Sequence, residues 1–455
     1  MLEANGNNAV LPLRKTKSIC PHCLRSLEAS IVAKGRCVYL VRECLEHGRI
    51  QELISSDVDA YRQIYQLYEA LGIPGRYSMP HDRFTLYTTT RCNMACPICV
   101  VNADAQYGQE IPIARLIEVL KKNSIKRKKI SLFGGEPTVR NDLPELIAAI
   151  RRPGNTVTLF TNGIRLADYS YLKSLKENGV KDIYLQFDGF DRGVEQTMRG
   201  GDWLDQKLQA LENMRRLDMP VVLEVTTSRQ HNLKEIKTIL QFALRDSSIR
   251  GICFRSYSMF GRKKLMLPRL LVDDIIEEIN QFTSGRTTKE EANVFAKLLF
   301  VIAYLFHFKC CFTHRYIIFK KLGNGHYKTM SEYFDIRTIN KRLCNLTLIM
   351  KKNKLLGTLY IIFVILPGLI TLRSLPCLFD FGKILMRYRF GTIFSNSSFG
   401  KSYLIIEIDS PCDRLTVELD RVCNSGAIME DGTILPSFYD SSLRKERAMS
   451  PGHFS

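Results

Sequence analysis

The sequence predicts an α/β protein with a parallel sheet, either a barrel or an open sheet, and with a further region at each end. Three observations carry this prediction. Short apolar, β-branched runs alternate with amphipathic stretches between residues 84 and 258. A small segment rich in cysteine and histidine, 15–52, precedes this part of the chain. A long basic and apolar region, 263–403, follows it and is expected to be mostly helical.

Six strands and five helices are expected in the alternating part. The strands are Phe84–Thr89, Ile130–Phe133, Thr156–Phe160, Asp182–Phe187, Val221–Thr226 and Gly251–Arg255. The helices are Ile113–Lys122, Leu143–Arg151, Ser170–Asn178, Trp203–Arg216 and Leu233–Leu244. Parallel strands end at one edge of a sheet, where such folds place their chemistry. The unusual motifs follow this rule: a cysteine cluster, GGEPT, TNG and QFDG come at the ends of the first four strands.

Length and composition limit the class of protein. The 455 residues are enough for two or three domains, and 45% hydrophobic residues indicate a globular chain. The net charge of +19 suggests an anionic partner, although solubility alone is an equally weighted explanation. The 14 cysteines have the short spacings of metal sites, which disfavours a secreted disulfide scaffold. The N-terminus has no apolar signal segment, so a cytoplasmic protein is expected.

Changes in composition divide the chain into five predicted parts. These are a metal-binding module at 15–52, a helical linker at 53–83, the α/β core at 84–262, the basic apolar region at 263–403, and a tail at 404–455.

Two turns containing cysteine and histidine flank a predicted hairpin near the N-terminus. The hairpin has strand-like pieces at Ser30–Ala33 and Cys37–Arg42. Two such turns can hold one tetrahedral ion. The candidate ligands are Cys20, Cys23, Cys44 and His47, with His22 and Cys37 as alternatives. Two pairs of buried free thiols are the competing explanation.

Three cysteines follow the first predicted strand with the spacing C-x3-C-x2-C. They are Cys92, Cys96 and Cys99. A structural zinc ion would normally take four protein ligands, whereas a 4Fe–4S cluster held by three cysteines leaves one iron open for a substrate or cofactor. Arg91 and Asn93 offer hydrogen-bond donors beside such an anionic cluster. A redox pair of Cys96 and Cys99 is the alternative, but it leaves Cys92 unexplained.

These motifs resemble those of the radical S-adenosylmethionine (SAM) enzymes. That superfamily has CxxxCxxC after its first strand and a GGE motif after its second, as in FGGEPT at 133–138. CNMACPICVVNA, GGEPTVRNDLPELI, TNGIRLAD and IYLQFDG are similar to the branch that contains archaeal tetraether lipid synthase and proteins described as dihydropterin methyltransferases. The resemblance covers residues 18–262 and, more loosely, 404–447. It implies a partial (β/α)6 barrel.

The resemblance also implies roles for individual residues. The ligands of the 4Fe–4S cluster would be Cys92, Cys96 and Cys99. The residues that bind SAM or lie beside it would be Gly134, Gly135, Glu136, Asn162, Gln186 and Asp188. Simple turns are the alternative for Asn162-Gly163 and Asp188-Gly189. The N-terminal module would hold a mononuclear iron or zinc ion.

The implied reaction is reductive cleavage of SAM to a 5′-deoxyadenosyl radical, which abstracts hydrogen from an unactivated carbon. The electron would come from a partner such as a ferredoxin or flavodoxin. The product would be a carbon–carbon bond or another alkyl modification in an archaeal-type membrane lipid; the alternative is methyl transfer to a pterin or a similar small heterocycle. Glu224, Arg255 and Ser256 depart from the family pattern at positions where the family contacts its substrate. The identity of the substrate is therefore left open.

A metal-knuckle protein that binds nucleic acid is the rival outside enzymes. It would use the N-terminal cysteines and the basic stretch SIKRKK at 124–129. This stretch has no interleaved aromatic residues for base stacking, so no nucleic acid is expected as a partner.

Leu355–Leu372 has no charged residue over 18 positions, the lower limit for a membrane-spanning helix. Pro367 and Gly368 interrupt it. Three structures remain open for it: a membrane span, an interfacial helix on an anionic lipid surface, and ordinary core. The shorter run Leu298–Phe306 is expected to be core or interface.

The tail carries two candidate ligands of an auxiliary 4Fe–4S cluster, Cys412 and Cys423. Four more cysteines could complete such a site: Cys310, Cys311, Cys344 and Cys377. The cysteine that commonly follows this turn in the family is missing from DGTILPSFYD, and ordinary buried cysteines are the alternative.

Overall fold

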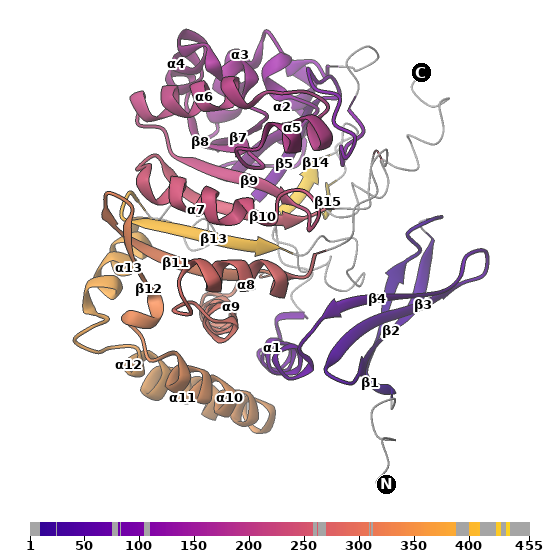
Figure 1. Cartoon of the computed structure of the whole chain (residues 1–455), viewed down its shortest axis with the longest axis vertical. Coiled ribbons are helices and arrows are strands. Elements are labelled where there is room, and N and C mark those ends of the chain that lie inside the picture. Colours follow the sequence, from indigo (N-terminus) through magenta and orange to yellow (C-terminus); the bar gives the residue numbers. More distant parts are fainter. Residues whose placement is uncertain are drawn as a thin grey trace.

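A computed structural model describes most of the chain (Figure 1). The described residues are 10–23, 25–74, 81, 83–103, 110–257, 262, 270–308, 310, 313–387, 400–409, 425–428 and 434–436. Cys311, Cys412 and Cys423 lie outside them, so the predicted auxiliary cluster stays a prediction.

The α/β core is a run of six parallel strands that are neighbours in chain order. They are β5 (Arg83–Thr89), β6 (Lys129–Gly134), β7 (Thr156–Thr161), β8 (Val180–Gln186), β9 (Val221–Thr227) and β10 (Ile249–Ser256). The helices between them are α2 (Ile113–Lys122), α3 (Leu143–Arg151), α4 (Tyr169–Asn178), α5 (Arg192–Arg199), α6 (Leu204–Arg216) and α7 (Glu235–Arg245). All six predicted strands and all five predicted helices are confirmed.

Helix α5 was not predicted. Its buried face carries two charged side chains, Glu195 and Arg199, beside Val194 and Met198. A helix whose buried side is half charged lacks the apolar period that sequence analysis detects.

The C-terminal extension is mostly helical, as expected, but it also lengthens the sheet at both edges. Next to β10 lie β13 (Tyr403–Asp409), which is parallel to it, then β11 (Arg315–Gly323) and β12 (His326–Thr329), which is antiparallel to β11. On the other edge, β14 (Ser425–Ile428) is parallel to β5, and β15 (Ile434–Pro436) follows. Within the described residues, the result is one mixed sheet of eleven strands.

The helices of the extension lie next to β11 and β13. They are α8 (Val272–Phe282), α9 (Lys289–Phe306), α10 (Ile336–Lys352), α11 (Lys354–Tyr360), α12 (Leu366–Gly368) and α13 (Leu375–Arg387). Figure 1 shows α9 to α13 below the core, beside β11 to β13.

The two faces of the sheet have different surroundings. Side chains of the outer face, such as Leu223, Phe254 and Ile406, pack with the crossover helices into the main core. The inner face of the core strands carries a row of rings, in which Phe133, Phe160 and Tyr184 contact their neighbours. Since side chains alternate along a strand, this inner face continues from β10 onto β13 and β11.

The N-terminal module is a four-stranded antiparallel sheet, where only a two-stranded hairpin was predicted. Its strands are β1 (Val10–Ile19), β2 (Ser26–Lys34), β3 (Cys37–Cys44) and β4 (Gly48–Ser55). The outer strands β1 and β4 were missed because both are rich in polar and exposed residues, so the alternation of buried side chains is weak.

Helix α1 (Val58–Ala70) connects this module to the extension. Asp57 caps it by accepting hydrogen bonds from the backbone of Asp59 and Ala60. Tyr68 packs on Phe300 of α9 and donates its hydroxyl to the carbonyl of Cys310, at 3.2 Å. A second apolar core therefore joins the N-terminal sheet, α1, the extension helices and the inner face of β11 and β13.

The uncharged stretch 355–372 folds into three short pieces. Helix α11 is followed by a π-helical turn, Ile361–Ile365, and then by α12, which contains Pro367. Among the residues that the structure describes, no helix has the length and apolar character needed to cross a bilayer.

Candidate active site and metal centre

The loop after β5 holds the three predicted cluster cysteines, and all three are partly buried. The backbone N–H of Met94 donates to Cys92 Sγ and that of Ala103 donates to Cys99 Sγ, each at 3.4 Å. Such N–H donors stabilise negative charge on sulfur, which suits thiolates that hold an iron–sulfur cluster.

Arg262 holds the loop from outside. Its backbone N–H donates to the carbonyl of Cys99 at 2.7 Å, and its guanidinium donates to the carbonyl of Cys96 at 3.0 Å. This contact links the end of the core to the cysteine loop. It was not predicted, because the partner atoms are backbone carbonyls that leave no mark in a sequence.

The three thiols are close enough to influence one another. Burial, together with Glu136 and the other two thiols, raises the pKa of Cys92 to about 12. Burial also raises the pKa of Cys96, against the opposing effect of Arg199. Three thiolates grouped in this way repel one another unless a cationic centre joins them, so the donor set fits a cluster of several irons.

The GGE motif at the end of β6 locks onto this loop. The backbone N–H of Gly135 donates to Thr89 O and that of Glu136 donates to Arg91 O, both at 2.8 Å. Gly134 has φ +135°, and a Cβ on Gly135 would lie 2.0 Å from Arg91 O. Only glycine permits this approach of two backbones.

The Gly135→Ala substitution should therefore displace the cysteine loop. We expect a loss of about 1–3 kcal/mol in the free energy of unfolding, as for other overpacked sites, and a lower iron content after anaerobic reconstitution. Gly193→Ala is the matched control, because Gly193 lies near the start of α5 and a Cβ there meets only one side chain, Asp191. Equal iron content in both variants would contradict the assigned role of Gly135.

The carboxylate of Glu136 is buried and organises the strand ends around it. It accepts hydrogen bonds from Thr138, through both backbone N–H and hydroxyl, from the Thr161 hydroxyl and from the backbone N–H of Asn162. Burial raises its pKa, whereas these four hydrogen bonds lower it. All four hydrogen bonds to the Glu136 carboxylate come from the protein itself. We therefore expect the backbone of the GGE motif, and not this side chain, to contact a ligand.

Asn162 extends from β7 toward the cysteine loop. Its side-chain amide donates to Asn93 Oδ1 at 2.7 Å. The structure thus brings the TNG motif and the cysteine loop together, as the predicted SAM site requires.

Gln186 and Asp188 lie beside the same site but within a network of buried charges. Asp188 accepts two hydrogen bonds from Arg199, at 2.6 and 3.1 Å, and one from the backbone N–H of Thr226. Gln186 Oε1 accepts from Lys207 Nζ at 2.6 Å. Both side chains thus have partners within the chain. Their predicted contacts with SAM or substrate stay predictions.

Three charged residues of this network were not predicted: Glu195, Arg199 and Lys207. Lys207 Nζ contacts both carboxylate oxygens of Glu195 at 2.7 Å, and both side chains are almost completely buried. Arg199 places its cation next to Cys96, which opposes the rise that burial causes in the pKa of that thiol. No pattern of spacing distinguishes such residues from charges exposed on a helix.

The inner face of β9, β10 and β13 carries a second polar group. Arg255 donates to Glu224 Oε2 at 2.8 Å and to Asp409 Oδ2 at 2.6 Å. His314 pairs with Glu407 and Asp409, at 2.9 and 3.3 Å. Burial raises the pKa of Glu407, but hydrogen bonding and charge from His314 lower it to about 2 overall. Glu224 and Arg255, two of the three residues that depart from the family pattern, are therefore direct partners.

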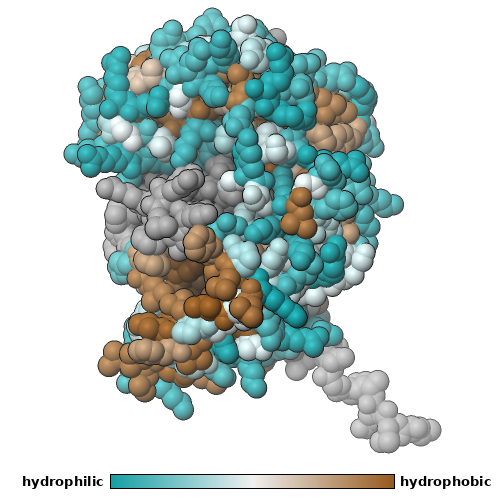
Figure 2. Space-filling model, turned by 90° about the vertical axis from the view of Figure 1, so that its left-hand side faces the viewer, coloured by the Kyte–Doolittle hydropathy of each residue, from teal (hydrophilic) through white to brown (hydrophobic). Residues whose placement is uncertain are grey.

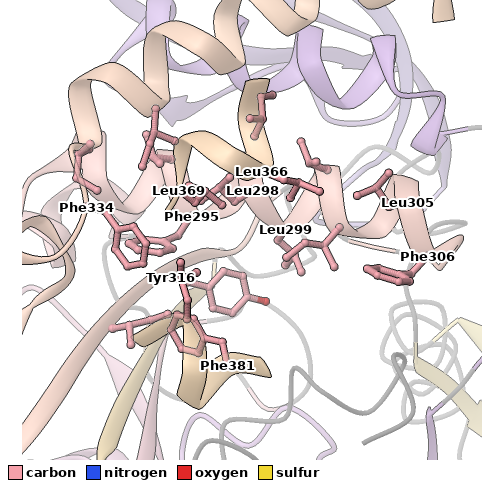
Figure 3. Close-up of a pocket in the computed structure, with 18 of the residues that line it drawn as sticks. Phe295, Leu298, Leu299, Leu305, Phe306, Tyr316, Phe334, Leu366, Leu369 and Phe381 are labelled. Atoms are coloured by element: carbon pink, nitrogen blue, oxygen red, sulfur yellow. The ribbon is translucent and has the colours of Figure 1, made fainter. Parts of the chain in front are cut away.

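An apolar cavity of about 410 Å³ adjoins this polar group on the same face of the sheet (Figure 3). The sheet contributes Tyr316, Ile318 and Ile405 to its wall. Tyr316 pairs with Glu407, and Ile405 lies two residues before Glu407 on β13. Helices α9, α10 and α13 close the cavity from the other side, and Figure 3 shows Leu305 and Phe306 at one end with Phe334 at the other.

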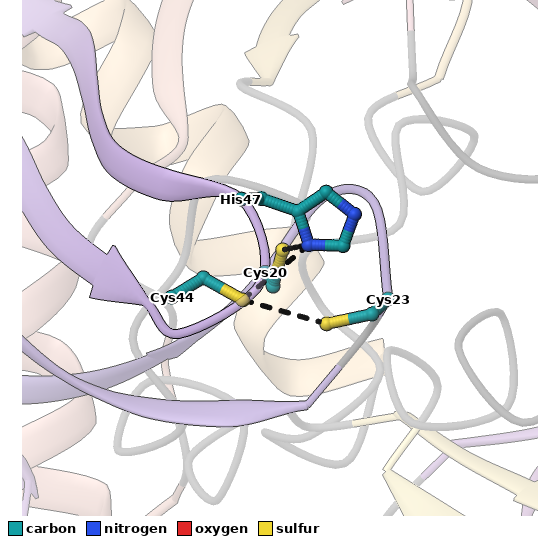
Figure 4. A group of neighbouring side chains, drawn as sticks. All are labelled: Cys20, Cys23, Cys44 and His47. Atoms are coloured by element: carbon teal, nitrogen blue, oxygen red, sulfur yellow. Dashed lines mark hydrogen bonds between the residues drawn. The ribbon is translucent and has the colours of Figure 1, made fainter.

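The four predicted ligands of the N-terminal module come together in one group (Figure 4). The ligand atoms of Cys20, Cys23, Cys44 and His47 all lie within 4.8 Å of one another. His47 is the main cause that lowers the pKa of Cys44 to about 6. His22 stacks on His47, with ring centroids 4.9 Å apart, and Cys37 is outside the group. Three sulfurs and one nitrogen at these distances fit a tetrahedral zinc ion.

Cys44→Ser should remove the metal and destabilise the module, because binding of a structural zinc ion contributes folding free energy. We expect the zinc content to fall and the Tm to drop by several degrees, at roughly 2–4 °C for each kcal/mol lost in a domain of moderate size. Cys37→Ser, in the same sheet, should keep both values. The assignment fails if the two serine variants lose zinc equally.

Comparison with known proteins agrees with both sites. The sequence profile of the radical SAM superfamily matches residues 86–243, and that of the HMPTM N-terminal zinc ribbon domain matches residues 12–56. The chain is similar to a 7,8-dihydro-6-hydroxymethylpterin dimethyltransferase of Methanocaldococcus jannaschii, with 34% identity over 306 residues, 61% of this chain and 60% of the relative. A probable GTP 3′,8-cyclase of Pyrococcus abyssi is 31% identical over 179 residues, 38% of this chain and 56% of the relative.

The chain thus spans about 60% of the length of these curated relatives. Among solved structures, Streptococcus suis SuiB bound to S-adenosylmethionine matches 47% of this chain and 49% of its own, with 18% identity and a TM-score of 0.40. The superfamily profile spans the strand ends that carry the cysteine loop, the GGE motif and Asn162. These motifs come together in one site at the sheet edge, and residues 86–243, which contain them, form a domain of the radical SAM superfamily.

Proposed function

We propose that the chain is a radical SAM enzyme that abstracts hydrogen from an unactivated carbon of a long aliphatic substrate, for carbon–carbon bond formation or alkyl modification of a membrane lipid. When bound, a 4Fe–4S cluster and SAM supply the 5′-deoxyadenosyl radical for this abstraction. The observation that carries the substrate class is the apolar cavity, which continues the inner face of the sheet beyond the polar group around Arg255.

The chain's own residues would hold and orient these groups. The cysteines of the loop would supply three thiolates, and the backbone at Gly134 and Gly135, which lies against that loop, would meet the amino acid end of SAM. Asn162 and Asn93 connect the two motifs. The buried pair of Asp188 and Arg199 joins the end of β8 to α5 beside Cys96, so these groups are positioned before any ligand binds.

The cavity supports an aliphatic substrate through its chemistry. Its lining consists of aliphatic and aromatic side chains, with the Tyr316 hydroxyl as a polar group. Burial of each CH2 group of a chain there would contribute about 0.8 kcal/mol to binding. At the edge nearer to the core strands, Arg255 and His314 could meet the polar end of such a molecule, because both lie on the inner face within ion-paired groups.

Methyl transfer to a pterin is the second candidate. The relative from Methanocaldococcus jannaschii favours it, since that protein is a dihydropterin dimethyltransferase and shares 34% of its residues with this chain over the matched part. The polar group around Glu224 and Arg255 also offers the carboxylate and guanidinium that a heterocycle with several ring nitrogens could bind.

The two candidates make opposite predictions for a cavity variant. Ile302 lines the cavity from α9, and Ile302→Trp should fill part of it; Leu348→Trp, on the exposed side of α10, is the control. A long-chain phospholipid should stimulate formation of 5′-deoxyadenosine by the reconstituted wild type and the control, but not by Ile302→Trp. Stimulation by a dihydropterin in all three proteins, with none by lipid, would favour the pterin and overturn the lipid proposal.

A further inference from the structure

The region Lys354–Phe379 exposes an unusual number of large apolar side chains. Ten of them share this property and form what we call the apolar collar: Leu355, Leu356, Leu359, Ile362, Phe363, Leu366, Ile370, Leu372, Leu375 and Phe379. Their exposed fractions run from 40% for Leu366 to 90% for Leu372. In Figure 2, apolar surface gathers on the side of the molecule where Figure 1 places α11 to α13.

The collar is not the outer surface of an ordinary amphipathic helix. Ile361 and Ile365 of the π-helical turn are fully buried in the second core, while Ile362 and Phe363 beside them are exposed. The segment is therefore apolar on both its inner and its outer side. A helix that is apolar all round normally lies within a protein core or in contact with lipid.

The charge around the collar favours an anionic partner. Between residues 336 and 379 the chain has seven lysines and arginines and no aspartate or glutamate. Lys351, Lys352 and Lys354 are exposed at one end of the collar, and Arg373 is exposed within it, next to Leu372. Apolar side chains bordered by basic ones are the composition of a segment that lies in the interface of an anionic membrane.

The cavity lies directly behind the collar. Leu366 belongs to both, and Ile365 and Leu369 line the cavity from the same stretch of chain. Figure 2 shows the apolar surface hollowed in this area. A chain could thus pass from a bilayer into the cavity without crossing polar surface.

We propose that the apolar collar docks the protein on an anionic membrane, with its apolar side chains in the headgroup–acyl boundary and its lysines against lipid headgroups. This docking does not depend on the radical chemistry, so it can be tested without iron or SAM.

The test is co-sedimentation of the full chain with vesicles of phosphatidylcholine alone or mixed equally with phosphatidylglycerol. The wild type should pellet with the mixed vesicles, and less so at high salt. Phe363→Ser/Leu372→Ser should abolish pelleting, whereas Leu322→Ser, an exposed leucine outside the collar, should not. Because both collar residues are exposed, the double variant should keep its fold, which circular dichroism can verify.

A charge-reversal double variant tests whether the lysines at the end of the collar contribute to membrane binding. Lys351→Glu/Lys352→Glu, at the end of α10, should weaken binding to the mixed vesicles by about 30-fold or more, at roughly fivefold for each basic charge removed. Lys121→Glu/Lys122→Glu, at the end of α2, is the matched control and should bind like the wild type.

Three outcomes would overturn the proposal. The wild type could remain in the supernatant with both vesicle types, or the collar variant could pellet as well as the wild type. Alternatively, sedimentation equilibrium could show a dimer that Phe363→Ser/Leu372→Ser converts to a monomer, with no vesicle binding; the collar would then be an interface between two copies of the chain. None of these results would change SAM cleavage by the core.

Discussion

Replacing Cys96 with alanine is expected to abolish the formation of 5′-deoxyadenosine from SAM while the core stays folded. Cys96 lies on the loop after β5 and takes no part in the apolar cores, so its removal costs little packing. It would supply one of the three thiolates of the predicted cluster, and a cluster with only two protein ligands is not expected to stay bound. Chromatographic measurement of 5′-deoxyadenosine under anaerobic reducing conditions should show a fall of at least about 10³-fold, comparable to loss of an essential catalytic group.

The control for this variant is Cys344→Ala. Cys344 is a partly exposed thiol on α10, outside the core strands. It should keep the formation of 5′-deoxyadenosine, and circular dichroism should be alike for both variants. Wild-type activity in Cys96→Ala would show that the loop does not hold the cluster.

Lys207→Met is expected to cause a large loss of stability in the core. Lys207 and Glu195 are both buried, and Lys207 Nζ contacts both carboxylate oxygens. Removal of one partner leaves a buried carboxylate without its cation, which costs about 3–5 kcal/mol. Denaturant titration should show this loss, whereas Lys173→Met, in an exposed pair with Glu177, should change the free energy of unfolding by less than about 1 kcal/mol.

The loss in Lys207→Met should depend on pH in a known direction. Burial raises the pKa of Glu195 even with Lys207 present, and removal of the cation raises it further. A carboxyl group whose pKa is higher in the folded state than in the unfolded state favours folding most at low pH, and this contribution is lost as pH rises through the folded value. The variant should therefore be closer to the wild type at pH 5 than at pH 8; a larger deficit at pH 5 would contradict the assignment.

Much of the site could be predicted because it is encoded in short stretches of chain. Cys92, Cys96 and Cys99 lie within a single loop, and the metal ligands at 20–23 and 44–47 lie in two turns of one small sheet. The parallel strands of the core are short runs rich in apolar and β-branched residues, since most positions on both faces are buried. These signals need no knowledge of distant contacts.

The rest depends on contacts between distant parts of the chain. β13 joins the sheet through β10, about 150 residues earlier in the sequence, where Arg255 meets Asp409. An apolar run alone does not reveal such a partner. The buried charges Glu195, Arg199 and Lys207 look like ordinary surface residues of a helix until the helices are packed. The stretch 355–372 was ambiguous for a similar reason, because its composition does not tell which side faces the second core.

The most direct test of the central claim is electron paramagnetic resonance of the anaerobically reconstituted, reduced protein with and without SAM. A cluster held by three cysteines has one iron without a protein ligand, so SAM should bind there and change the spectrum. We predict a 4Fe–4S signal in the wild type that shifts when SAM is added, and that is lost in Cys96→Ala. An iron–sulfur signal that SAM leaves unchanged, or no such signal in correctly folded protein, would contradict the radical SAM site described above.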